Sequence, residues 1–155
     1  MPWSRSLRRL GLLAAGVAML GGCYSMAQPS FHPGNARQLL VAIARRGVAA
    51  ESMAGESACD DHSLIENAIH LRTTVASDPV ERDVWIYAFR SKGWEETKPA
   101  VDACEAAYAA ANPGATITRV DIPVYRAFGA DWSPELAAAV RDGLTEASTM
   151  GVPGQ

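Results

Sequence analysis

The chain is poor in the residues from which most enzyme sites are built. Its 155 residues include three histidines and three cysteines, and aromatic residues make up 7% of the total. It has neither a Gly-x-Ser-x-Gly nucleophile elbow nor a glycine-rich phosphate-binding loop. These absences argue against the commonest hydrolase and nucleotide-binding designs, although a catalytic triad assembled from distant residues leaves no such signature.

A hydrophobic run long enough to span a membrane is also missing. The run of small and apolar residues from Leu10 to Leu20 covers 11 residues, whereas a transmembrane helix needs about 20. Three arginines and no acid precede it, at Arg5, Arg8 and Arg9. A short basic segment followed by a short apolar one is typical of a cleavable signal peptide, so we expect residues 1–22 to direct export and to be removed.

The apolar run ends in Leu20-Gly21-Gly22-Cys23. This tetrapeptide resembles the lipobox of bacterial lipoproteins. The resemblance implies that the Cys23 thiol receives diacylglycerol and that Cys23 becomes the first residue of the mature chain. By the same resemblance, Tyr24 in place of aspartate implies sorting to the outer membrane, facing the periplasm. An ordinary signal peptidase has an alternative site after Ser25-Met26-Ala27, and cleavage there would give a soluble periplasmic or secreted protein.

Basic side chains are in the minority once the signal peptide is removed. The whole chain has 14 Lys and Arg against 17 Asp and Glu, and loss of the three signal-peptide arginines leaves 11 basic side chains. Nucleic-acid binding and electrostatic docking to anionic lipid both depend on clustered Lys and Arg. We therefore expect no nucleic-acid partner, and we expect the acyl chains to hold the protein at the membrane.

The cysteines that remain in the mature domain form an even pair. Because Cys23 is either acylated or removed, Cys59 and Cys104 are left together in an oxidising compartment. We expect them to form a disulfide, for which the chain-entropy estimate at this loop length is about 4 kcal/mol. The alternative is two buried free thiols.

Residue patterns predict a single α+β domain over 35–151, preceded by an extended tether over 23–34. The expected fold is a small, mostly antiparallel sheet of about three strands with three to four helices packed on one face. Helices are predicted at 35–46, 99–112 and 133–150, strands at 83–91 and 116–126, a helix passing into a strand at 62–76, and a loop at 47–61. The 83–91 strand is apolar on both faces, so it is expected to be central.

One spacing points to a metal site. His62, Glu66 and His70 recur every four residues and would share one face of a continuous helix. Two imidazoles and a carboxylate suit zinc or another divalent transition metal. The competing interpretation is an exposed helix cap beside one half-buried histidine, and the pattern differs from the His-Glu-x-x-His signature of metalloproteases.

The 83–91 strand also carries a candidate contact surface. Trp85, Tyr87 and Phe89 share one face of this strand. If no helix covers that face, the three rings form a platform for a partner protein or an apolar ligand. If a helix does cover it, they are ordinary core.

These patterns favour a non-enzymatic cell-envelope lipoprotein that acts as an interaction or accessory module, with an envelope protein as its possible partner. The alternative is an envelope metal-binding protein that uses His62, Glu66 and His70 with zinc as its cofactor. A small hydrolase is the third hypothesis, and no catalytic residue is assigned to it.

Overall fold

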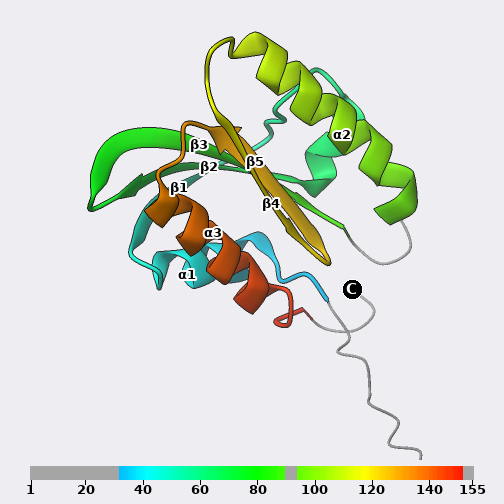
Figure 1. Ribbon diagram of the computed structural model, residues 1–155. Helices are drawn as coiled ribbons and strands as arrows, with labels where there is room; N and C mark the ends of the chain where they lie inside the picture. The colour runs from blue at the N-terminus through cyan, green and yellow to red at the C-terminus, as the bar shows by residue number, and fades with distance from the viewer. Residues whose placement is uncertain (1–31, 90–93, 152–155) are drawn as a thin grey trace, which may run out of the picture.

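The computed structural model describes residues 32–89 and 94–151, and Figure 1 shows how their elements are arranged. In chain order the elements are α1 (Ala36–Ala44), β1 (Val48–Met53), the 3-10 helix η1 (His62–Asn67), β2 (Ala68–Val75), β3 (Asp78–Ala88), α2 (Trp94–Ala111), β4 (Ile117–Ile122), β5 (Tyr125–Ala130) and α3 (Pro134–Ala147).

The five strands form one antiparallel sheet in the order β1-β2-β3-β5-β4. This confirms the predicted α+β class and the central position of β3. The sheet has five strands, however, and helices lie on both of its faces, with α1 and α3 on one side and α2 on the other (Figure 1). The prediction of about three strands covered on one face was therefore wrong in both details.

The first missed strand is β1, because 47–61 was predicted to be loop. Val48–Met53 pairs with β2 along its whole length, from Val48 opposite Val75 to Met53 opposite His70. Its residues are mostly small or polar and it lies at the edge of the sheet. Backbone pairing with β2 holds such a strand without a strong side-chain pattern, so the sequence gives little sign of it.

The second missed strand is β5, because 116–126 was predicted to be a single strand. The chain turns back at Pro123 and Val124, and β5 then pairs with both β4 and β3. Almost every residue of β5 is buried, so the strand shows no alternation of apolar and polar residues. Gly129 is required within it, because a Cβ atom there would lie 2.3 Å from the Asp83 carbonyl oxygen.

Local signals located several elements correctly. Asn35 caps α1 by accepting a hydrogen bond from Gln38 N at 2.9 Å, and Ser133 caps α3 by accepting one from Leu136 N at 3.1 Å. The predicted passage from helix to strand at 62–76 is present as η1 followed by β2. Helix α2 begins earlier than predicted, at Trp94, so Pro99 lies inside the helix and not in its first turn.

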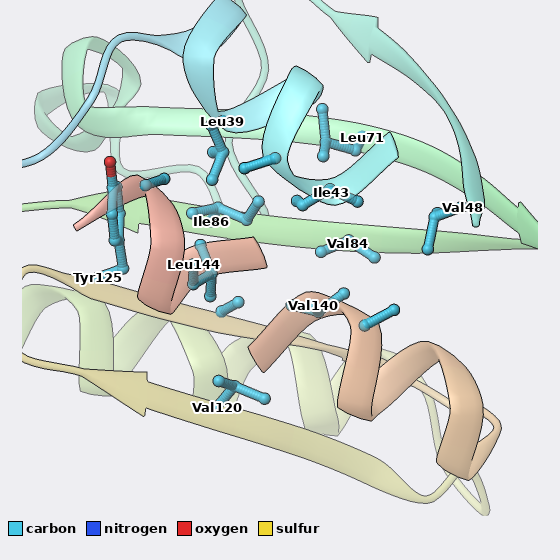
Figure 2. Close-up of a cluster of buried hydrophobic side chains, with 14 of the residues drawn as sticks. Leu39, Ile43, Val48, Leu71, Val84, Ile86, Val120, Tyr125, Val140 and Leu144 are labelled. Carbon is cyan, nitrogen blue, oxygen red and sulfur yellow. The ribbon is translucent and has the colours of Figure 1, made fainter. Parts of the chain in front are cut away.

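The larger core lies between the sheet and the helix pair α1 and α3 (Figure 2). It is mainly aliphatic, and its fully buried side chains include Leu39, Ile43, Leu71, Val84, Ile86, Val140 and Leu144. The two helices cross closely at Gly143, where a Cβ atom would lie 2.7 Å from Ile43 Cγ1. This face is held together mainly by removal of apolar surface from water.

His32 and Gly34, among the last residues of the predicted tether, contact the end of α3. His32 N donates to Ser148 O at 2.9 Å, and Gly34 N donates to Ala147 O at 3.1 Å. These bonds satisfy carbonyl groups at the C-terminal end of α3. The signal peptide and Cys23 lie outside the described residues.

Candidate functional site

The α2 face of the sheet is crossed by residues 54–61, here called the strap, which run from the end of β1 to η1. Cys59 in the strap is joined to Cys104 of α2, with an S–S distance of 2.05 Å and a Cα–Cα distance of 5.3 Å. The predicted disulfide is therefore confirmed. Because the bond joins the strap to α2, these two segments together cover the middle of the sheet on this face.

The side chain of Tyr87 in β3 links the sheet to the strap by hydrogen bonds. The Tyr87 side chain is fully buried, and its hydroxyl lies 3.1 Å from Ser57 Oγ and 3.2 Å from Cys104 Sγ. The hydroxyl oxygen also accepts a hydrogen bond from Ala58 N at 3.2 Å. Burial raises the pKa of Tyr87, which keeps the phenol neutral and able to donate.

His70 of β2 provides a second tie between strap and sheet. Its Nδ1 lies 2.6 Å from Glu56 Oε2 in the strap, and its Nε2 lies 2.7 Å from Asp83 Oδ1 in β3. The imidazole stacks on Trp85, with 3.7 Å between the ring centroids and 11° between the planes. A carboxylate oxygen lies within hydrogen-bond distance of each ring nitrogen. Neither nitrogen is left for a metal ion or for proton abstraction.

The predicted metal set is not brought together. His62 and Glu66 are exposed on η1, whereas His70 is buried in β2. The metal hypothesis required a continuous helix over 62–70, but η1 ends at Asn67 and the chain becomes extended at Ala68. Over residues 32–89 and 94–151, no three His, Cys, Asp or Glu side chains are placed to hold a metal ion.

The predicted partner surface is covered. Trp85, Tyr87 and Phe89 retain only 8%, 0% and 3% exposure, because α2 and the strap lie over them. Together with Leu64, Val101, Cys104 and Phe128 they form a second, largely aromatic core. The three rings therefore stabilise the fold and are not an open platform.

Arg126 of β5 is buried beside this aromatic core and is held by acids. Its Nε lies 2.6 Å from Asp121 Oδ1, and its Nη1 bonds to Asp102 of α2. Lys98 Nζ lies 2.7 Å from the other oxygen of Asp102. Hydrogen bonds lower the pKa of Asp102, with the larger effect from Lys98 and the smaller from Arg126. The network joins α2 to the β4–β5 hairpin. The Arg126 guanidinium is therefore already bound by the carboxylates of Asp121 and Asp102.

Among the described residues, the α2 face carries two open hollows that are candidate sites. One, of about 280 Å³, lies over β1, β2 and β3 and is lined by Ala49, Ala50, Glu51, Arg72, Thr73, Thr74 and Glu81. The other, of about 480 Å³, lies between α2 and β4 and is lined by Lys98, Asp102, Glu105, Ala106, Ala109, Ile117 and Arg119. Both mix charges of opposite sign with small side chains, and neither has the apolar lining usual for a small-molecule site.

Sequence reasoning missed the pairing of His70 with Glu56 and Asp83. The signal was present only in part, because His70 and Asp83 lie on neighbouring strands but Glu56 lies in a segment with no pattern.

In the described part of the chain, no helix is long and apolar enough to cross a membrane. Comparison with protein-family models, curated proteins and solved structures finds no significant match to this chain.

Proposed function

We propose that this chain is a non-enzymatic accessory protein of the bacterial cell envelope, held at the membrane by lipid on Cys23 and acting through contacts with other proteins. The Cys59–Cys104 disulfide is the observation that carries this proposal. Disulfides persist in oxidising compartments outside the cytoplasm. Two of the three cysteines are used in this bond, which leaves Cys23 alone in its lipobox-like setting.

The chemistry of the strap also favours an accessory role. His70 and Tyr87 are the groups on the α2 face best suited to acid–base catalysis, and both are engaged in ties between strap and sheet. A histidine held at both ring nitrogens has no free position for a substrate. Residues used in this way stabilise the domain, so binding by surface contact is the function that suits the arrangement.

Intact-mass measurement of the protein from membranes of its host tests the proposal. We expect a chain that begins at Cys23 and carries acyl groups, and whose mass rises by two hydrogen atoms on reduction. A Cys23→Ala variant should yield no acylated product. The matched control is the Cys59→Ala, Cys104→Ala double variant, which should keep the lipid and lose the mass gain on reduction.

Other masses would contradict specific parts of the proposal. A lipid-free chain that begins at Gln28 would mean a soluble exported protein and would overturn the membrane tether. An acylated chain whose mass does not change on reduction would overturn the bridge and, with it, the main support for an oxidising location.

A further inference from the structure

Strand β4 (Ile117–Ile122) forms one edge of the sheet. Helices α2 and α3 lie on opposite faces beside it (Figure 1). Within the described residues, no backbone group outside the sheet hydrogen-bonds to Ile117–Ile122. An edge of this kind presents unpaired N–H and C=O groups to another strand.

The hydrogen-bond phase of β4 shows which groups are free. Asp131 N donates to Thr116 O at 2.8 Å, so Thr116 directs its peptide groups towards β5. Direction alternates along an antiparallel strand, and Thr118, Val120 and Ile122 therefore also bond to β5. The peptide groups of residues 117, 119 and 121 point outward.

The charges on β4 are complementary to those of a second copy of the same strand. If two copies pair antiparallel about an axis through Val120, Arg119 lies opposite Asp121 of the second copy, and Asp121 lies opposite its Arg119. Both side chains are about half exposed, at 49% and 48%. Within one copy Arg119 Nε already lies 3.4 Å from Asp121 Oδ2, and Asp121 also binds Arg126, so the second copy would extend an existing ion-pair network. An axis through Arg119 or through Asp121 would instead place like charges opposite each other, which is unfavourable.

From this register we infer that two copies of the chain associate through β4, with Val120 on the two-fold axis, to form one continuous sheet. Residues 119 and 121 of each copy then exchange hydrogen bonds through their outward peptide groups. The contact is isologous, because the same surface is used by both copies. The inference does not depend on the lipid anchor.

The surroundings of β4 suit a second copy. Beside β4, helix α2 presents the small side chains of Ala106 and Ala109, which line a hollow together with Ile117 and Arg119. The hollow of about 480 Å³ between α2 and β4 has room for side chains of the paired strand. The opposite edge, β1, carries Glu51 as its only charge, so no self-pairing of β1 brings opposite charges together.

Cysteine cross-linking of the chain expressed in whole host cells tests the register, whether or not the chain carries lipid. A Val120→Cys thiol would face its own copy at a non-hydrogen-bonded pair, with Cα atoms about 4.5 Å apart, which suits a disulfide. Thr118→Cys is the matched control on the same strand, because its two copies would be offset by four residues, about 13 Å. The parent chain gives the background from the native cysteines.

We expect Val120→Cys to give a dimer on a non-reducing gel that disappears on reduction, and Thr118→Cys to give no more dimer than the parent. Because Val120 is only 2% exposed, the melting temperature of each variant is measured alongside. A folded Val120→Cys variant that stays monomeric, or equal dimer from both variants, would overturn the inference.

A charge reversal in the Val120→Cys background tests complementarity separately. In the Arg119→Glu variant, the introduced glutamate of each copy would face Asp121 of the other, and this repulsion should lower the cross-linking yield about 5-fold. The Arg119→Lys variant keeps the positive charge and should preserve the yield. An unchanged yield for Arg119→Glu would contradict the register centred on Val120.

Discussion

The two faces of the sheet are stabilised in different ways. The α1/α3 face buries a large aliphatic cluster, and α1 and α3 touch directly at Gly143. The α2 face buries fewer side chains, most of them aromatic, and adds a disulfide, the His70 ties and the Arg126 network. The smaller core is thus supplemented by covalent and polar links.

This difference predicts which conditions affect each face. Apolar burial depends little on pH or on reductant, whereas a disulfide is broken by reduction and carboxylate pairs weaken on protonation. The α2 face should therefore respond first to reductant and to acid. The α1/α3 face should respond mainly to changes in side-chain volume.

The largest expected effect comes from breaking the α1/α3 face. Leu144→Ala removes a fully buried side chain and should lower the free energy of unfolding by about 2–5 kcal/mol, because a cavity remains. Urea unfolding measures this loss. Val41→Ala on α1, where the side chain is 43% exposed, should change little. Equal effects of the two substitutions would contradict the assignment of this core.

Removing the disulfide should have the next largest effect. The Cys59→Ala, Cys104→Ala double variant is expected to lose about 2–4 kcal/mol of unfolding free energy, because the unfolded chain is no longer cross-linked. Reduction of the parent protein should produce a loss of similar size. Urea curves that overlay before and after reduction would show that the strap does not depend on the bond.

Loosening the strap alone should have a smaller effect. Glu56→Gln weakens the tie to His70 and should cost about 1 kcal/mol, since the Glu56 side chain is half exposed. Hydrogen exchange should rise in the strap and not in α3. The control is Glu51→Gln on neighbouring β1. Equal exchange in both variants would argue against a tie at His70.

The smallest expected effect concerns acid stability. Lys98 and Arg126 hold the pKa of Asp102 below its ordinary value, so its contribution is complete above the unfolded pKa and is lost as pH falls through the folded pKa. Asp102→Asn should flatten the acid side of a stability-against-pH curve. Asp142→Asn, on the exposed side of α3, should leave the curve unchanged. If the Asp102→Asn variant lost as much stability at acid pH as the parent, the acid sensitivity would have to come from other carboxyl groups.

The parts of the fold that sequence patterns predicted are those with local signals. Asn35 and Ser133 were recognisable because a cap bonds within its own helix. The strand around Trp85 was recognisable by its β-branched and aromatic residues. Strands β1 and β5 lacked such signals, because one is held by an edge ladder of small residues and the other is buried on both faces.

The site was less predictable because it depends on the tertiary arrangement. The pairing of Cys59 with Cys104 followed from counting cysteines, which needs no geometry. The environment of His70 depends on where the strap crosses β2, and nothing in residues 54–58 indicates that path. Whether Trp85, Tyr87 and Phe89 are surface or core was decided by the position of α2, which a strand pattern does not contain.

Hydrogen exchange read by mass spectrometry, before and after reduction of the mature protein, tests the contrast between the two faces most directly. On reduction we expect faster exchange in the strap, η1 and α2, with α1 and α3 still protected. Equal acceleration on both faces, or none on either, would contradict an α2 face held by its cross-links.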